Sequence, residues 1–368
     1  MPGHPNRRLN DRLTLTRGGV LLEPREGVEY ESWGVLNPAS ARGMDGRLRL
    51  FPRLVGPDNY SRIGVGVVHE DDDGLPSGYE PLGLALEPEH SWERNARTAG
   101  TEDARITRID ALDCWIMTYA AYGPLGPRVA LARSSNLETW ERLGPVTYSY
   151  EARHGIDWNL PCNKDALFFP EPVNDPAGRP AIAVLHRPMF DLSEITPGES
   201  APLPEGLTHD RLGMWISYIP LEEALADPRS LTHWSDHELV ALPEHEWEWL
   251  KIGGGTPPVL TDEGWLIIHH GVQGELLPNT DHQPHVIYCA GAMLLDRDDP
   301  RIVLERSDTA LLAPKTAEER EGIVPNVVFP TAIEPHGDGW IGFYGMADTR
   351  IGWFRLTLAP LPSASDLR

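Results

Sequence analysis

The sequence predicts an all-β fold, specifically a five-bladed β-propeller. Its 35 glycines and 35 prolines are scattered along 368 residues and divide the chain into short pieces. Few windows keep a helical period for ten residues, so strands are expected to dominate. One hairpin theme also recurs: an acidic or glycine turn, Gly-Trp or Cys-Trp, an apolar strand, a turn and a second strand. Such recurrence is typical of a repeated sheet.

Three stretches carry this hairpin theme. They begin at Trp115, Trp265 and Trp340 and continue into second strands near residues 128, 286 and 351. Because the tryptophan holds the same place in each hairpin, we expect it to lie in the core of a blade. Trp265 could alternatively supply a platform on which a sugar stacks.

A strand with polar residues at its start precedes each hairpin, and two further strands of this kind bring the count to five. These strands cover residues 61–68, 102–106, 163–170, 253–258 and 325–330. Five blades in 368 residues leave roughly 70 each, more than a compact propeller repeat needs. The first strand of each blade lines the channel of a propeller, so the five polar starts should converge at one mouth.

We expect a single domain over residues 1–368, with an N-terminal extension and two loop insertions. The insertions cover approximately residues 170–180 and 190–212, which are rich in proline, glycine and acidic residues. Residues 134–140 read as an outer turn whose side chains hydrogen-bond their own backbone.

Composition excludes several classes of function. The formal net charge of −23 opposes binding to nucleic acid or to anionic membranes, which positive fields recognise. No run approaches about 18 apolar residues and the start lacks an apolar signal segment, so a cytoplasmic location is expected. The three cysteines, Cys114, Cys162 and Cys289, form no Cys-x-x-Cys pair and are expected to be buried free thiols. No metal site is expected, because the adjacent His269 and His270 would point to opposite faces of a strand.

A glycine triplet beside a lysine is the most informative local feature. Gly253, Gly254 and Gly255 lack Cβ atoms, so the backbone can approach a ligand closely, and Lys251 suits an anion there. Glycine triplets also occur in plain hairpin turns, and this reading stays open. A nucleotide loop is not indicated, because neither phosphate-binding glycine motif is present.

Seven segments taken together resemble glycoside hydrolase family 130, which comprises β-mannoside phosphorylases and some β-mannosidases on a five-bladed propeller. They are residues 37–38, 102–105, 163–170, 186–188, 251–272, 326–330 and 344–348. The resemblance covers roughly residues 35–355, in the order and strand context of the family.

The resemblance implies that Asp103 is the general acid. Cleavage of a glycosidic bond needs a proton for the leaving oxygen. The family is thought to route this proton through the hydroxyl on carbon 3 of the mannosyl ring. An aspartate at a strand start can also be a simple turn cap.

The resemblance further implies a phosphate site made by Lys164, Arg187, Lys251 and His270, with lysine at position 164 where many members carry arginine. Guanidinium and ammonium groups suit a phosphate dianion. The same cations could instead form buried ion pairs between blades through Asp165 or Glu171.

Asn37, Asp165 and Asp348 fall on family positions near the bound sugar, and Tyr344 is a second candidate for a stacking platform. The sequence departs from the family pattern at Ala104, where proline is usual, and this loosens the turn after Asp103. The segment 163–165 reads Asn-Lys-Asp rather than Asn-Arg-Asn, which resembles members that act on β-1,2-linked mannosides.

We therefore expect an inverting phosphorylase that converts a β-manno-oligosaccharide and inorganic phosphate to α-mannose 1-phosphate, without a cofactor. One alternative is an inverting β-mannosidase on the same scaffold, with Glu102 or Asp165 as the base. Another is a propeller that binds glycans without catalysis. A homo-oligomer is possible.

Overall fold

Short helices and many strands make up the protein. The computed structural model describes residues 8–95, 99–192, 196, 198–275, 277 and 285–361. The helices in this part of the chain are α1 (Leu9–Arg12), α2 (Leu221–Ala226), α3 (Ala317–Arg320) and the 3-10 turns η1 (Glu29–Glu31), η2 (Ser91–Glu93), η3 (Asp110–Leu112), η4 (Ala152–His154), η5 (Pro228–Thr232) and η6 (Glu246–Glu248). None of them is long and apolar enough to cross a membrane. The all-β prediction is confirmed.

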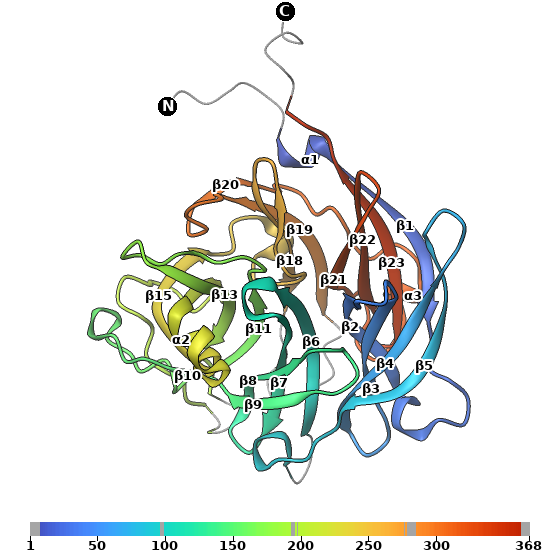
Figure 1. Cartoon of the computed structure of the whole chain (residues 1–368), viewed down its shortest axis with the longest axis horizontal. Coiled ribbons are helices and arrows are strands. Elements are labelled where there is room, and N and C mark those ends of the chain that lie inside the picture. The colour runs from blue at the N-terminus through green and yellow to red at the C-terminus, as the bar shows by residue number, and fades with distance from the viewer. Residues whose placement is uncertain are drawn as a thin grey trace, which may run out of the picture.

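Four β-sheets surround a common centre (Figure 1). The largest contains β2 (Gly34–Arg42), β3 (Leu48–Val55), β4 (Tyr60–Glu70), β5 (Pro76–Leu86), β6 (Ala99–Ile109), β7 (Cys114–Gly123), β8 (Gly126–Ser134) and β9 (Glu141–Pro145). The next contains β10 (Thr147–Tyr148), β11 (Cys162–Phe168), β12 (Val173–Asn174), β13 (Pro180–Met189), β14 (Met214–Pro220) and β15 (His233–Ala241). A third contains β16 (Lys251–Gly254), β17 (Val259–Thr261), β18 (Gly264–Gly274), β19 (Val286–Leu295) and β20 (Val303–Arg306). The last contains β21 (Val328–His336), β22 (Gly339–Met346), β23 (Arg350–Leu358) and β1 (Leu13–Leu22).

The four sheets are built from five antiparallel meanders. The largest sheet is two of them, β2–β5 and β6–β9, joined only by a short parallel pairing of β4 with β6. In the last sheet the N-terminal strand β1 pairs antiparallel with the C-terminal strand β23. Segments from the two ends of the chain therefore complete one meander.

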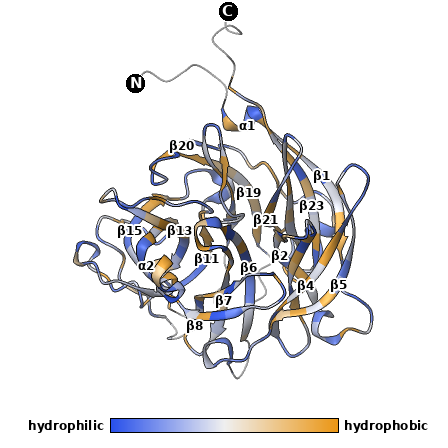
Figure 2. Cartoon of the chain, viewed as in Figure 1, coloured by the Kyte–Doolittle hydropathy of each residue, from blue (hydrophilic) through white to orange (hydrophobic). Residues whose placement is uncertain are grey.

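Hydrophobic clusters fill the space between successive meanders. Five such clusters are present, and each draws side chains from two neighbouring meanders. One of them joins the last meander to the first, through Phe343 and Ile341 on one side and Val35 and Leu50 on the other. Hydrophobic residues accordingly run along the strands of all four sheets, whereas many of the outer hairpin loops are hydrophilic (Figure 2). Apolar burial between sheets is the main stabilising contribution of this arrangement.

Four of the five predicted first strands lie at the start of a meander, and one prediction is wrong. Residues 102–106 lie within β6 and residues 163–170 coincide largely with β11. Residues 325–330 run into the start of β21, and residues 253–258 begin on β16. Residues 61–68 belong instead to β4, the third strand of its meander, whose first strand is β2. Ser61 and Arg62, the polar start on which the prediction rested, therefore do not mark a first strand. The glycines of β4 make room for neighbouring strands: a Cβ at Gly66 would overlap Tyr79, and one at Gly64 would crowd Leu54.

A buried glutamate recurs just before the first strand of three meanders. Glu93, Glu248 and Glu319 each close a capping box and accept hydrogen bonds from two backbone N–H groups. Each also contacts one side chain on the strand that pairs with this first strand, namely Tyr119 Oη, His269 Nε2 and Tyr344 Oη respectively. Each pairs with an arginine on the outermost strand, namely Arg142, Arg306 and Arg17. The same set of hydrogen bonds and one ion pair thus occurs in three separate meanders.

Several smaller expectations can be compared with the structure. Trp115 and Trp265 are buried in the core, at 3% and 2% exposure, as predicted, whereas Trp340 is only partly buried against its cluster. In the outer turn at residues 134–140, Ser134 Oγ and Asn136 Oδ1 accept backbone N–H bonds, which confirms that prediction. The three cysteines are buried and free. Part of the proposed insertion at 190–212, residues 193–195 and 197, lies outside the described residues.

Candidate active site

Three predicted site residues lie on β-bulges. Asn37 on β2, Asp103 on β6 and Asp165 on β11 have φ angles of 42°, 49° and 58°. At each bulge, two residues of the first strand lie opposite one residue of the neighbouring strand: Pro52, Tyr119 and His186 respectively. Asn and Asp tolerate the left-handed region better than most residues, and a bulge re-aims side chains that would otherwise alternate between faces.

Asp103 is held by groups from two strands of the preceding meander. Its Oδ1 accepts hydrogen bonds from Asn37 Nδ2 at 2.9 Å and from Arg53 Nη1 at 3.1 Å. Burial opposes ionisation of this carboxyl, but the positive charges of Arg53, Lys164 and Arg105 outweigh it and lower its pKa. The side chain is 11% exposed, so the carboxyl lies at the edge of solvent.

Asp165 lies at the centre of a second group of basic side chains. Its Oδ2 accepts a 2.7 Å hydrogen bond from Arg187 Nε, and His270 Nε2 is 3.6 Å from the same oxygen. Arg105 Nη2 lies 3.6 Å from its Oδ1. Burial would raise the pKa of Asp165, but the guanidinium groups beside it, Arg187 above all and Arg105 as well, depress it strongly. Arg105 also donates to the backbone carbonyl of Asp103 at 2.8 Å, which joins the two groups into one cluster.

Gly253 is the residue at which the glycine triplet meets this cluster. A Cβ at this position would overlap Asp165 Oδ2 and the ring of His270, and would crowd Arg187 Nε. The backbone of β16 thus passes directly against the ion-paired side chains. Close approach, rather than a positive φ angle, is the reason that glycine is needed here.

Lys164 reaches the same cluster from the other side. Its Nζ lies 3.3 Å from Glu102 Oε2, while Arg53 Nη2 donates to Glu102 Oε1 at 2.9 Å. The ammonium also lies 5.6 Å from the centroid of the Tyr122 ring. With side chains 21% and 20% exposed, Lys164 and Arg53 bring positive charge to the surface of a chain whose net charge is −23.

Aromatic rings form the border of the cluster near Lys251. Its Nζ lies 5.1 Å from the centroid of the Tyr288 ring, and the His270 ring stacks on Tyr288 with centroids 6.2 Å apart. Burial lowers the pKa of His270 well below its ordinary value, so this imidazole is neutral near pH 7. It can therefore donate one N–H to a ligand without adding a charge.

Asp348 differs from the other carboxylates. Burial and the nearby charges of Asp103 and Glu102 raise its pKa to about 6, against the opposing effect of Arg53. Its φ angle of 50° places it, like Asp103, in the left-handed region. A carboxyl with this pKa can hold or release a proton near neutrality.

Tyr344 does not belong to the site, and this prediction needs correction. Its side chain is fully buried among apolar residues, and its hydroxyl donates to Glu319 Oε1 at 2.9 Å. It occupies the same place in its meander as Tyr119 does with Glu93. The strand alternation that brings its neighbour Gly345 against Asn37 turns Tyr344 into the core.

The structure therefore brings together eight of the nine predicted site residues, directly or through shared electrostatic neighbours. These are Asn37, Asp103, Lys164, Asp165, Arg187, Lys251, His270 and Asp348. Sequence reasoning assigned no role to Arg53 or Arg105, which lie between the carboxylates. The available signal for Arg53 was a charged residue inside the apolar strand Leu-Phe-Pro-Arg-Leu-Val. No group of His, Cys, Asp and Glu among the described residues could hold a metal ion.

Comparison with known proteins identifies the family of this chain. Residues 231–361 match the family model described as β-1,4-mannooligosaccharide phosphorylase of glycoside hydrolase family 130. The chain is 31% identical over 344 residues to the 1,2-β-oligomannan phosphorylase of Thermoanaerobacter sp., an alignment that covers 90% of this chain and 93% of the relative. The β-1,2-mannobiose phosphorylase of Listeria innocua is 32% identical over 254 residues, covering 69% of this chain and 56% of that protein. The chain belongs to glycoside hydrolase family 130.

The fold agrees with this assignment. The solved structure of the Listeria innocua β-1,2-mannobiose phosphorylase bound to β-1,2-mannobiose has a TM-score of 0.65 at 23% identity, and the match covers 96% of this chain and 98% of that one. A structure from the family's glycoside hydrolases that target β-1,2 mannosidic linkages in Candida mannan has a TM-score of 0.68 at 18% identity, over 94% of this chain and 97% of that one.

Proposed function

We propose that this chain is an inverting β-mannoside phosphorylase that uses inorganic phosphate and no other cofactor. The observation that carries the proposal is the cationic cluster around Asp103 and Asp165. It contains five cationic side chains against four carboxyl groups, in a chain of net charge −23; the cations are those of Arg53, Arg105, Lys164, Arg187 and Lys251. Within the described residues, Arg187 Nη1 and His270 Nδ1 have no hydrogen-bond partner although both are buried. An oxyanion is the ligand that would satisfy the Arg187 N–H group, and it would also accept from His270 in the Nδ1–H tautomer.

We further propose that the scaffold is a five-bladed β-propeller in which each meander is one blade. Five meanders and five apolar clusters between successive meanders support this, as does the pairing of β1 with β23 in the last sheet. In such a ring the bulges of β2, β6 and β11 face one axial mouth.

In the proposed reaction, Lys164, Arg187, Lys251 and His270 hold the phosphate. One phosphate oxygen attacks carbon 1 of the mannosyl unit as the bond from carbon 1 to the leaving oxygen breaks. The electron pair of that bond stays with the leaving oxygen, which takes a proton supplied by Asp103. Inversion at carbon 1 gives α-mannose 1-phosphate and a shortened sugar.

Asp103 must be protonated at that step, although the cations around it lower its pKa. A phosphate dianion held by Lys164 and Arg187 would offset those charges and raise the pKa of Asp103 toward the useful range. Asp348, with a pKa of about 6, is the second proton-holding group in the cluster. We assign it, with Asn37 and Asp165, to binding of the sugar hydroxyls.

Hydrolysis is the less favoured reading because both candidate bases are already engaged. Glu102 accepts from Arg53 at 2.9 Å and lies 3.3 Å from Lys164 Nζ. Asp165 is ion-paired with Arg187, and its pKa is strongly depressed. A carboxylate stabilised as an anion in this way is a weak base toward water.

The substrate we propose is a β-1,2-linked manno-oligosaccharide. Three of the relatives are named for this linkage: a 1,2-β-oligomannan phosphorylase and two β-1,2-mannobiose phosphorylases. A β-1,4-mannooligosaccharide phosphorylase is also similar, at 30% identity over 75% of this chain. The test is incubation with β-1,2-, β-1,3- and β-1,4-mannobiose, each with and without phosphate. We expect α-mannose 1-phosphate from the β-1,2 substrate only when phosphate is present; release of mannose at the same rate without phosphate would establish hydrolysis instead.

Two variants separate the roles of the aspartates. Asp103→Asn should fold normally but reduce kcat at least about 1,000-fold, because it removes the proton donor. Asp348→Asn should mainly raise KM for the mannoside. If Asp348→Asn abolishes turnover while Asp103→Asn retains it, the acid has been assigned to the wrong carboxyl.

A further inference from the structure

A chain of buried hydrogen bonds runs through the meander that carries Lys164 and Arg187. Asn163 Nδ2 lies 2.9 Å from His186 Nδ1, and His186 Nε2 lies 2.7 Å from Ser217 Oγ. Ser217 Oγ in turn lies 2.8 Å from His237 Nδ1. All four side chains are at most 1% exposed. The chain crosses from β11 through β13 and β14 to β15.

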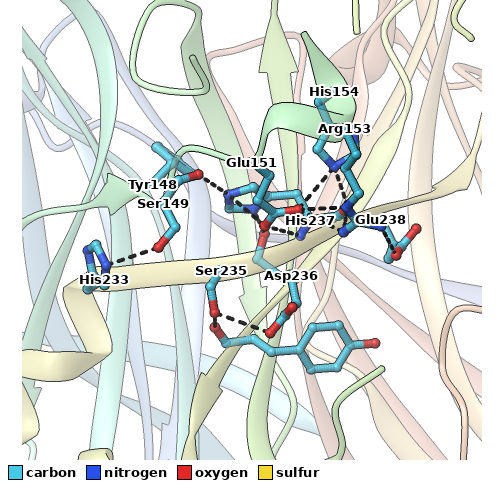
Figure 3. Close-up of polar contacts among 12 residues, drawn as sticks. Tyr148, Ser149, Glu151, Arg153, His154, His233, Ser235, Asp236, His237 and Glu238 are labelled. Carbon is cyan, nitrogen blue, oxygen red and sulfur yellow. Dashed lines mark hydrogen bonds and ion pairs between the residues drawn. The ribbon is translucent and has the colours of Figure 1, made fainter. Parts of the chain in front are cut away.

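The direction of each of these hydrogen bonds can be worked out from the outer end, at His237. His237 Nε2 lies 3.2 Å from the carbonyl oxygen of Ser149 and 3.6 Å from Glu151 Oε1 (Figure 3). Both groups can only accept, because Glu151 is held as an anion: burial alone would raise its pKa, but the backbone N–H of His237 and the side chain of Arg153 lower it. His237 Nε2 must therefore carry a proton.

Each further link then follows from the one before it. Burial lowers the pKa of His237 to about 4 and that of His186 well below its ordinary value, so both rings are neutral near pH 7. Neutral His237 protonated on Nε2 accepts at Nδ1, so the Ser217 hydroxyl donates to it. Ser217 then accepts from His186 Nε2–H, which leaves His186 Nδ1 as an acceptor. Only the NH₂ side of the Asn163 amide can meet that acceptor.

The inner end of the chain lies beside the proposed phosphate site. Asn163 precedes Lys164 on β11, and His186 precedes Arg187 on β13, where Lys164 and Arg187 are cross-strand partners. His186 is also the single residue opposite the bulge that carries Asp165. A bulge leaves its backbone without regular pairing, so a side-chain bond across it restricts the local geometry.

We propose that His186, Ser217 and His237 are positioning residues that act through Asn163 to hold the β11 bulge, and hence Lys164 and Asp165, in place for phosphate. None of the three contacts the reacting atoms; their effect is on orientation. This inference rests on the proposed phosphorylase function, but the order of protons along the chain does not.

The kinetic test breaks the chain at its middle. Ser217→Ala should raise KM for phosphate by about fivefold or more, because it leaves the buried nitrogens of His186 and His237 without their hydroxyl partner. KM for the mannoside should stay within about twofold, whereas a general loss of structure would affect both substrates. Ser217→Thr keeps the hydroxyl and should restore KM for phosphate. The matched control is Ser235→Ala, which removes a hydroxyl that donates to the Tyr218 carbonyl and takes no part in these hydrogen bonds.

A second variant covers the case in which Ser217→Ala does not fold. His237→Gln keeps a donor for Ser149 but removes the acceptor for Ser217, and should give the same selective rise in KM for phosphate. Equal rises in both KM values, or no rise in either, would overturn the positioning role.

A spectroscopic test is independent of the reaction. Nitrogen-15 NMR of histidine-labelled protein at pH 7 should find both His186 and His237 as the Nε2–H tautomer. A proton on Nδ1 of His186 would refute the proton order, whatever the enzyme does. Conversely, wild-type protein that makes no sugar phosphate but shows the expected tautomers would overturn the proposed function and leave the order of the chain intact.

Discussion

At the residue scale, the site depends on a few positions where the backbone departs from regular strand geometry. Asn37, Asp103 and Asp165 each have a positive φ angle at a bulge. Such a conformation costs about 1–3 kcal/mol in a residue other than glycine, so the surrounding contacts must maintain it. The bond from Asn37 to Asp103 and the ion pair of Arg187 with Asp165 are contacts of this kind.

Gly253→Ala tests the close approach of β16 to the ion-paired side chains. The added Cβ would overlap Asp165 and His270, so we expect a rise in KM for phosphate of at least about tenfold and a loss of about 1–3 kcal/mol in stability. Kinetics at varied phosphate and a denaturant titration measure both. Gly78→Ala is the control, because nothing lies closer than 3.6 Å to a Cβ there. Unchanged KM for phosphate in Gly253→Ala would contradict the placement of the phosphate site.

Tyr344→Phe tests the corrected role of Tyr344. Loss of the hydroxyl leaves one fewer donor to the buried Glu319, and we expect stability to fall by about 1–3 kcal/mol. kcat/KM for the mannoside should stay within about twofold of the wild-type value. A fall of tenfold or more in kcat/KM with unaltered stability would show that Tyr344 does take part in binding the sugar.

At the element scale, the short turns that precede three of the first strands are each held in place by a buried glutamate. Glu93, Glu248 and Glu319 are each fully buried and each combine backbone, second-strand and arginine partners. Breaking a buried ion pair from one side leaves an uncompensated charge, which is costly. These glutamates therefore hold each turn to the outer edge of its own meander.

Glu248→Gln should destabilise the protein in a pH-dependent way. Burial raises the pKa of Glu248, but His269 and Arg306 outweigh it and lower the pKa to about 2, from an ordinary 4.5. The stabilisation is therefore present above about pH 4.5 and is lost as the pH falls toward 2, by up to about 3 kcal/mol. Urea unfolding of wild type and variant across this range measures the difference. Glu246→Gln, in the same turn but exposed, should show no such trend.

At the scale of the whole molecule, a hollow lies near the ends of the first strands that are away from the charged cluster. This hollow, of about 390 Å³, is lined by residues from all five meanders, including Ser40, Thr107, Pro170, Pro257 and Glu334. Ser40 Oγ donates to Glu334 at 2.6 Å, and burial raises the pKa of Glu334 to about 7. The molecule thus has strongly charged side chains near one end of its first strands and, near the other, a buried carboxyl whose pKa is raised to about 7.

Glu334 should make stability decrease with rising pH. Its folded pKa of about 7 exceeds the ordinary value of 4.5, so its favourable contribution is present below about pH 4.5 and disappears as the pH passes 7. As the pH rises from 4.5 to 7, the free energy of unfolding of Glu334→Gln should increase relative to that of wild type by up to about 3 kcal/mol. Thermal unfolding from pH 4.5 to 8 measures the gain, with the exposed Glu26→Gln as control. A constant difference between variant and wild type would show that Glu334 is ionised in the fold.

The sequence by itself determined the all-β class, the repeated hairpins and the residue types of the cluster, because strand alternation and turn composition are local properties. The resemblance of seven segments to one family named nine site residues, and the structure brings eight of them together. Only the tertiary structure decided that β2 rather than residues 61–68 begins the first meander, and that Tyr344 faces the core. It also decided that Arg53 and Arg105 lie between the carboxylates. These features depend on register, bulges and contacts between distant strands, and a single extra residue in a strand reverses which face a side chain takes.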